Sequence, residues 1–194
     1  SHSLVLTTAH SVRNWKSYPE PVFHGSALFF GPLKEMYYFR VTSVLEENSS
    51  LDYAIVNISW QQNVMPPDIG VVRSIVVSGD FKSNEIYAVP FFALGTPWDR
   101  IPDPIRSNGT QFLILSDPRL EETLLFNAGV VEGNSGGPIF LSDGRLLGIV
   151  SGGNHGLGAD GFDRNDPANI ESWNQAIPIG RIYRESQLLK KLLP

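Results

Sequence analysis

The sequence predicts an all-β protein of the barrel or sandwich class that ends in a helix. Short runs rich in valine, isoleucine, threonine and aromatic residues follow one another, and turns rich in glycine, proline, asparagine and aspartate separate them. Helical spacing of apolar residues occurs near the carboxyl end, in residues 180–193. With 42% hydrophobic and 18% charged residues, the chain has the composition of a globular protein with a sizeable core.

The first part of the chain, residues 1–65, is expected to form an amino-terminal lobe. Its first strand-like run ends at His10, where small residues allow a tight turn, and residues 13–22 are typical of a loop. Further strands are expected at residues 23–30, 37–45 and 51–58. Residues 60–70 are polar with two prolines and are expected to connect two lobes.

Residues 71–179 are expected to form the carboxyl-terminal lobe, followed by a helix in residues 180–194. The pair Asp143-Gly144 lies between two apolar runs and predicts a hairpin. Strands are expected at residues 71–78, 86–94, 111–115, 139–141, 146–150 and 175–179.

Charge and composition exclude several classes of function. The net charge of −5, from 15 basic and 20 acidic residues, offers no electrostatic footprint for nucleic acid or an anionic membrane. No apolar run approaches the roughly 18 residues of a membrane span. The absence of cysteine excludes disulfides and cysteine chemistry, and slightly favours an intracellular or bacterial-type protein. No cluster of histidine and acidic residues has the spacing of a metal site, so no metal or cofactor is expected.

Residues 133–138, Gly-Asn-Ser-Gly-Gly-Pro, place Ser135 among three glycines. Glycine allows tight turns and leaves main-chain N–H groups open to a ligand. A serine on such a turn can be presented to a substrate, although a polar surface turn has the same composition.

His10, Asp52 and Ser135 are the three residue types that an activated serine nucleophile requires. A serine hydroxyl needs a base within hydrogen-bond reach, and that base needs an acceptor that fixes its tautomer. The order His, Asp, Ser along the chain is that of a known triad. The alternative for Asp52 is a solvated residue at the head of a strand.

Three motifs together resemble those of chymotrypsin-fold serine proteases, the family of trypsin and the HtrA/Deg proteases. LTTAH at residues 6–10, LDYAIV at 51–56 and GNSGGP at 133–138 correspond to LTAAH, D-I-A-L/V and G-[DN]-S-G-G-P. The lack of cysteine and the segments at residues 93–97, 143–150 and 175–179 favour the HtrA-like branch. The resemblance implies two six-stranded antiparallel β-barrels and a C-terminal α-helix.

By this resemblance, His10 is the general base and then acid, Asp52 orients it, and Ser135 attacks the scissile carbonyl of a polypeptide substrate. The N–H groups of Gly133 and Ser135 form the oxyanion hole. Ser151 corresponds to a serine that supports the aspartate, although a plain strand-end serine is equally compatible with its position.

The resemblance also suggests the substrate preference. Gly129 stands at the floor of the pocket, where no acid favours arginine or lysine, and Val150 stands where glutamate-specific relatives carry histidine. Gly152 and Gly153 form an open wall. An uncharged, small-to-medium apolar P1 residue is expected. His155 corresponds to a position near the rim of the pocket. It either contacts substrate or is simply a loop histidine exposed to solvent.

One departure from the family concerns the first barrel, because only nine residues precede His10. The family places two strands before this histidine, so the expectation is that the chain is a fragment, a processed product that stays paired with an upstream piece, or a chain completed by another chain. Two functional alternatives stay open. One is a catalytically silent module that binds or scaffolds, and the other is an esterase that uses the same triad.

Overall fold

The structure is a computed structural model that describes residues 2–16, 24–28, 36–60, 74–77, 79–95, 105–117, 121–131, 133–152 and 173–193. The chain divides into two compact units, Ser1–Val72 and Arg73–Pro194. Each unit contains its own antiparallel sheet, and helices follow the last strand. The predicted all-β class with a helical carboxyl end is therefore confirmed.

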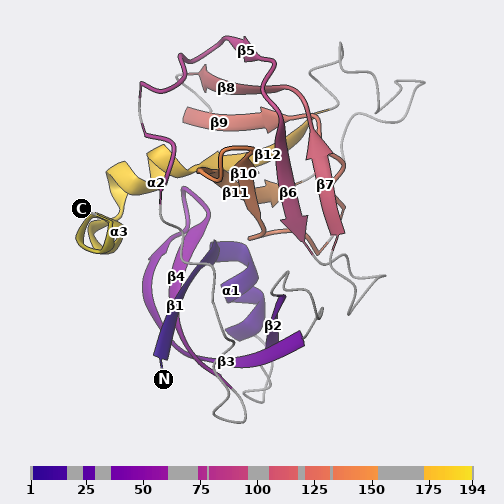
Figure 1. The fold of residues 1–194 in the computed structure, drawn as a ribbon. Helices are drawn as coiled ribbons and strands as arrows, with labels where there is room; N and C mark the ends of the chain where they lie inside the picture. Colours follow the sequence, from indigo (N-terminus) through magenta and orange to yellow (C-terminus); the bar gives the residue numbers. More distant parts are fainter. Residues whose placement is uncertain are drawn as a thin grey trace. The chain divides into compact units, whose positions relative to one another are not determined.

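Unit 1 has a four-stranded sheet whose strands follow the order β1-β4-β3-β2. Its elements in chain order are β1 (His2–Thr8), α1 (Ala9–Lys16), β2 (His24–Leu28), β3 (Met36–Asn48) and β4 (Tyr53–Trp60). The long strand β3 curves strongly, and α1 lies within this curvature (Figure 1). The expected extra strands beyond this sheet are not among the described residues, so that expectation stays a prediction.

The core of unit 1 joins α1 to β4. Val12 of α1 is buried with Ala54, Val56 and Ile58, which alternate along β4 and share one face of the sheet. Residues 13–22 are expected to form a loop, but α1 continues to Lys16. Burial of Val12 against β4 stabilises the helix, and this tertiary contact cannot be inferred from the helix propensities of residues 9–16.

Unit 2 has an eight-stranded sheet in the order β5-β8-β9-β12-β11-β10-β6-β7. Its strands are β5 (Ile86–Tyr87), β6 (Phe91–Gly95), β7 (Ile105–Gly109), β8 (Phe112–Asp117), β9 (Glu121–Phe126), β10 (Pro138–Leu141), β11 (Leu146–Gly152) and β12 (Asn174–Pro178). The hairpin β10–β11 turns at Asp143-Gly144, where Gly144 has φ 88°. The predicted hairpin is thereby found.

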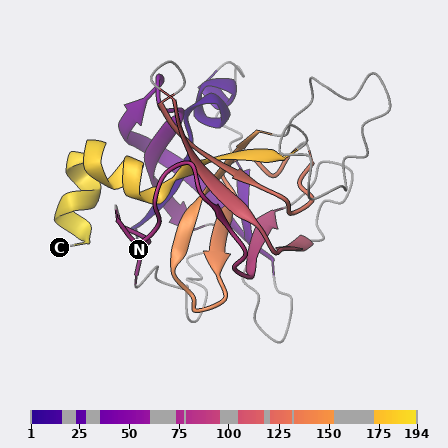
Figure 2. The ribbon, with the colours of Figure 1, turned by 90° about the horizontal axis from the view of Figure 1, so that it is seen from above.

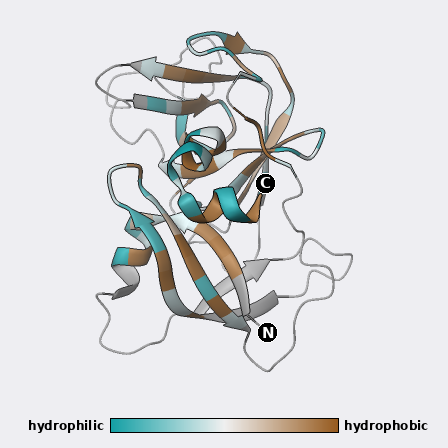
Figure 3. Ribbon diagram, turned by 90° about the vertical axis from the view of Figure 1, so that its left-hand side faces the viewer, coloured by the Kyte–Doolittle hydropathy of each residue, from teal (hydrophilic) through white to brown (hydrophobic). Residues whose placement is uncertain are grey.

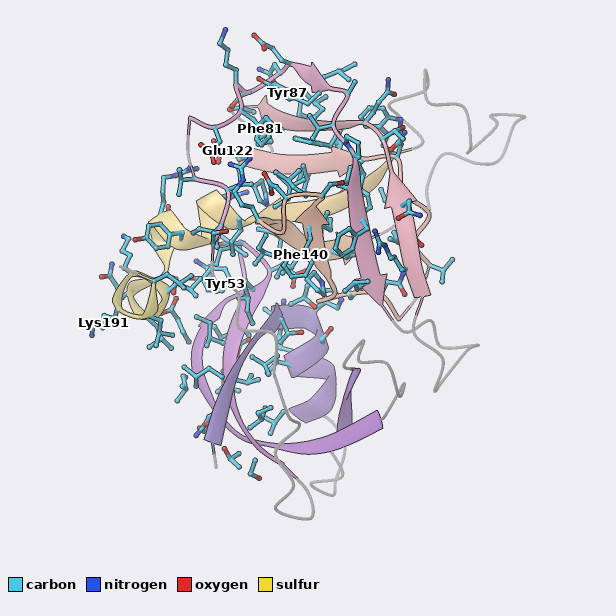
Figure 4. All side chains as sticks on the ribbon, in the orientation of Figure 1. Tyr53, Phe81, Tyr87, Glu122, Phe140 and Lys191 are labelled. Carbon is cyan, nitrogen blue, oxygen red and sulfur yellow. The ribbon has the colours of Figure 1, made fainter. Side chains whose placement is uncertain are left out.

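The core of unit 2 is rich in aromatic rings. Phe112 is fully buried and makes edge-to-face contacts with Phe81 and Phe91, at centroid separations of 4.9 and 6.1 Å. Tyr87 stacks on Phe112 at 5.6 Å and also contacts Phe81. Figure 4 shows Phe81 and Tyr87 close together beside β5 and β8. Phe126 of β9 extends this aromatic cluster through Phe91.

The carboxyl end forms two short helices instead of one, α2 (Ile179–Glu185) and α3 (Gln187–Leu192). They follow β12 directly (Figure 2). Buried Ser186 separates them, because its hydroxyl accepts the N–H of Leu189 and caps α3. Apolar and polar residues occupy different sides of these helices (Figure 3). None of the helices among the described residues is long and apolar enough to cross a membrane.

Other differences from the expected elements have local causes. The run at residues 86–94 divides into β5 and β6, with Pro90 between them, because proline cannot donate to a ladder. β7 and β9 are not anticipated by the sequence. Of the strand expected at residues 71–78 the structure describes residues 74–77, where Ile75 forms an isolated bridge with Leu146. β7 pairs with β6. It follows a proline-rich stretch, and the composition of that stretch predicts a loop that continues to Gly109.

We predict that Phe112→Ala lowers the free energy of unfolding by about 3–5 kcal/mol, because it empties a buried ring position. Ile86→Ala is the control, since Ile86 is 53% exposed, and it should cost less than about 1 kcal/mol. Urea unfolding of both variants measures the difference. Equal losses would show that Phe112 does not organise this core.

Candidate active site

His10 and Asp52 form a doubly hydrogen-bonded pair in unit 1. The ring Nδ1 of His10 lies 2.7 Å from Oδ2 of Asp52, and the main-chain N–H of His10 donates to Oδ1 at 2.9 Å. Both side chains are partly exposed, at 38% for His10 and 28% for Asp52. The carboxylate therefore holds the ring and the main chain of the same residue, which fixes the position of the imidazole.

Asp52 also determines where α1 begins. Its main-chain oxygen accepts the N–H of Ala9 at 3.0 Å, and its carboxylate accepts the N–H of His10. These are first-turn N–H groups, which have no partner within a helix. Asp52 thus acts as a helix cap from a distant part of the chain, and it does so with φ 57°, a left-handed conformation that aspartate tolerates better than most residues.

Arg13 forms a long ion pair with Asp52. It is one turn after His10 on α1, and its guanidinium lies 3.9 Å from both Asp52 and Glu47. The hydroxyl of Thr8 is 2.7 Å from that of Ser11. Nε2 of His10 has no hydrogen-bond partner among the described residues of unit 1.

Ser135 lies in unit 2 as the second residue of the second of two consecutive turns that share Asn134. The first is closed by Asn134 N–H donating to Val131 O at 3.1 Å, and the second by Gly137 N–H donating to Asn134 O at 2.9 Å. The third residues of these turns, Gly133 and Gly136, have φ 97° and 82°. Positive φ at this position is that of a type II turn, which favours glycine. The glycines predicted to shape a tight turn do so here.

The main chain of β11 holds the serine turn in place. Gly136 N–H donates to Val150 O, and Val150 N–H donates to Gly137 O, both at 2.8 Å. A side chain at Gly137 would meet Leu94 O at 2.1 Å, so glycine allows the turn to approach the end of β6 closely. These contacts fix the half of the turn that follows Ser135.

The other predicted site residues lie around the same part of unit 2 or outside the described residues. Val150 is buried at 2% exposure, and Ser151 and Gly152 end β11 half-buried. Gly129 is exposed, and a side chain there would meet no atom within 4 Å. Gly153 and His155 lie outside the described residues. Among the residues that the structure describes, no group of three histidine or acidic side chains is placed to hold a metal.

Sequence reasoning missed two residues of this site. Arg13 has significance only once residues 9–16 are helical, and the sequence favours a loop there. Asn134 sits beside Ser135 in the motif, but its burial at 4% exposure is a property of the folded turn. The sequence places Arg13 three residues after His10 and Asn134 directly before Ser135. These spacings indicate proximity only when the backbone conformation of each segment is known.

We predict that Asp52→Ala destabilises unit 1 by about 2 kcal/mol or more, because it removes a helix cap and places alanine at left-handed φ. Asp52→Asn keeps one carbonyl acceptor and a residue that tolerates this φ, so its loss should be smaller by about 1 kcal/mol. Urea unfolding followed by far-UV circular dichroism measures both. Identical losses would contradict the capping role.

The fold of the chain is similar to that of a solved structure. The crystal structure of Deg5 matches this chain with a TM-score of 0.58 at 16% sequence identity, over 93% of this chain and 75% of that chain. No protein-family model matches the sequence, and no curated protein does. At this identity the similarity concerns the fold alone. The chain has an all-β, chymotrypsin-like fold with helices at its carboxyl end.

Proposed function

We propose that the protein is a serine endopeptidase that uses Ser135, His10 and Asp52 and passes through an acyl-enzyme. The observation that carries this proposal is the pairing of His10 with Asp52 through both the ring Nδ1 and the main-chain N–H. A carboxylate on Nδ1 selects the tautomer in which Nε2 accepts a proton, which is what a general base for serine needs.

In this mechanism His10 takes the proton of the Ser135 hydroxyl while the oxygen attacks the carbonyl carbon of a peptide bond. Asp52 stabilises the imidazolium that forms, and His10 then gives the proton to the departing amine. Water enters by the same route and releases the acyl group. The residues act as nucleophile, base and orienting acceptor, and no cofactor takes part.

The oxyanion of the tetrahedral intermediate is assigned to the N–H groups of Gly133 and Ser135. Neither group donates a hydrogen bond to another described residue of unit 2. The turn conformation supports the assignment, because a type I turn would give its third residue φ near about −90° and rotate the peptide that carries the N–H. Gly133 has φ 97°.

A silent binding module with the same fold is the main competitor. Loss of a triad residue or a rotated peptide at the oxyanion turn would favour it. The presence of His10, Asp52 and Ser135 and the φ of 97° at Gly133 support the enzyme instead. An esterase would use the same residues, so it differs from the proposal only in the relative rates on ester and amide substrates.

We predict that a fluorophosphonate probe labels Ser135, because it reacts with a serine activated by a base. Ser135→Ala should abolish labelling, and Asp52→Asn should slow it by about 10³–10⁴-fold through loss of the required tautomer. Mass spectrometry of tryptic peptides locates the label. Ser142→Ala is the matched control, since this exposed serine follows β10 in the β10–β11 turn and should leave labelling unchanged.

Absence of label on folded protein would overturn the proposal, and folding is checked by circular dichroism of the same sample. Faster turnover of simple esters with no cleavage of peptides would instead select the esterase. Cleavage of a denatured protein substrate that Ser135→Ala abolishes would support the endopeptidase.

The substrate preference that we propose is an uncharged, small-to-medium apolar P1 residue, with Gly129 at the pocket floor and Val150, Gly152 and Gly153 around it. A Cβ on Gly129 would meet no atom within 4 Å, which leaves room for a substrate side chain there. Peptides with alanine or valine at P1 should be cleaved faster than peptides with arginine or glutamate.

We predict that Gly129→Asp raises kcat/KM for arginine at P1 relative to valine by about tenfold or more, because an acidic floor attracts a cationic side chain. Gly129→Asn is the uncharged control of similar size and should leave this ratio near its original value. Competition between two fluorogenic peptides measures the ratio. A change of equal size in both variants would mean that Gly129 is not at the floor of the pocket.

A further inference from the structure

Strand β6 of unit 2 carries large apolar side chains on both of its faces. Along this strand, Phe91 and Ala93 alternate with Phe92 and Leu94. Phe91 and Ala93 are buried at 2% exposure and belong to the core, whereas Phe92 and Leu94 are half-buried on the opposite face. The face of an antiparallel sheet that is turned away from the core is usually polar. Phe92 and Leu94 therefore mark this face as a candidate interaction surface.

The strands on either side of β6 extend this face. Phe140 of β10 lies opposite Phe92 in the register of the sheet, and the centroids of the two rings are 5.7 Å apart. On the other side of β6, Asn108 of β7 lies opposite Phe92, and Arg106 of β7 lies opposite Leu94. Figure 1 shows β6 and β7 side by side in unit 2. These five residues form what is called the β6 surface below.

Arg106 is an exposed cation whose guanidinium group is held by two contacts on the β6 surface. Its Cζ atom lies 4.2 Å from the centroid of the Phe92 ring, so the cation lies over an aromatic face. Its Nε–H donates to Oδ1 of Asn108 at 3.2 Å. Neither contact uses the hydrogen atoms of the two Nη groups. A guanidinium held in this way is prepared to bind a carboxylate through two parallel N–H···O bonds.

We propose that the β6 surface binds the C-terminal residue of a peptide that ends in an apolar side chain. The carboxylate pairs with the Nη groups of Arg106, and the apolar side chain packs beside it on Phe140 and Leu94. In a C-terminal residue the carboxylate and the side chain share one Cα atom, which suits a cation that lies directly over an apolar surface. An internal aspartate or glutamate carries its carboxylate at the end of the side chain and brings no apolar group of its own.

The choice of a peptide C-terminus as the occupant rests on the proposed function. Cleavage after a small-to-medium apolar P1 residue releases a peptide with a free carboxylate on an apolar C-terminal residue, which is the ligand that the β6 surface fits. Strand β10 begins at Pro138, three residues after Ser135, so the surface and the serine turn belong to the same unit. The β6 surface is thus a site for the product of the proposed reaction.

The first test titrates acetyl-Ala-Ala-Val, as the free acid, into ¹⁵N-labelled protein. The amide resonances of Phe92, Arg106 and Asn108 should shift and saturate. The same peptide with a C-terminal amide is the matched probe. It should bind about tenfold more weakly or worse, because the charge-assisted hydrogen bonds to the carboxylate are lost. Equal responses to the two peptides would overturn the proposal, as would shifts of the free acid confined to Gly133 and Gly136 in the serine turn.

Substitutions at Arg106 test the cation itself, and its exposure means that the fold should tolerate them. Arg106→Gln should weaken binding of the free acid by about tenfold or more. Arg106→Lys keeps the charge but loses the planar group that forms two parallel bonds, so it should also bind more weakly than the wild type. Lys191→Gln is the matched control, because it removes the same charge from an exposed position on α3. Equal weakening in Arg106→Gln and Lys191→Gln would contradict a specific site.

A third peptide, acetyl-Ala-Asp-Val with a C-terminal amide, separates the two possible sources of a carboxylate. It has one negative charge, as the free acid of the first peptide does, but carries it on an internal side chain. It should bind about as weakly as the amidated peptide without aspartate. If it shifts the resonances of Arg106 and Asn108 with the affinity of the free acid, the surface recognises acidic side chains, and the proposed occupant is wrong.

None of these binding measurements depends on catalysis, so the site and the proposed function can fail separately. If the fluorophosphonate probe does not label Ser135 but the free acid binds at Arg106, the proposed function fails and the binding site stands. If the protein cleaves peptides and the free acid leaves the resonances of Phe92, Arg106 and Asn108 unchanged, the binding site fails and the function stands.

Discussion

The attachment of Asp52 to residues 9 and 10 is the interaction on which unit 1 depends. One residue supplies its main-chain oxygen to Ala9, one carboxylate oxygen to the main chain of His10 and the other to the imidazole ring. The same contact begins helix α1, joins the end of β1 to the start of β4 and orients the imidazole ring of His10. Because one residue provides all three acceptors, the ring of His10 is held by the contacts that also begin the helix.

The serine turn of unit 2 is stabilised in a different way. Hydrogen bonds between main-chain atoms close both of its turns and fix it to β11. Gly133 and Gly136 adopt the positive φ values that these turns require. Gly137 has no side chain, so the turn can pack closely against the main chain of Leu94 in β6. The side chain of Asn134 lies within the turn, and its Oδ1 has no hydrogen-bond partner among the described residues. Backbone geometry, rather than side-chain bonding, therefore determines what this segment presents.

The sequence predicts the parts of this molecule that local patterns encode. The Asp143-Gly144 hairpin, the glycine-rich turn and most strands follow from turn chemistry and alternation. Helix α1 could not be predicted, because its cap comes from Asp52 and its burial from β4, both distant in sequence. The break at Ser186 depends on one hydroxyl cap. Motif resemblance selects His10, Asp52 and Ser135, but burial of Asn134 emerges only from the folded backbone.

The two bonds between the serine turn and Val150 have a consequence for sequence change. They use only the amide and carbonyl of Val150, while its side chain is buried elsewhere at 2% exposure. Any residue except proline retains such atoms at this position. Substitutions at residue 150 other than proline can therefore change the packing around β11 while both hydrogen bonds to the serine turn remain.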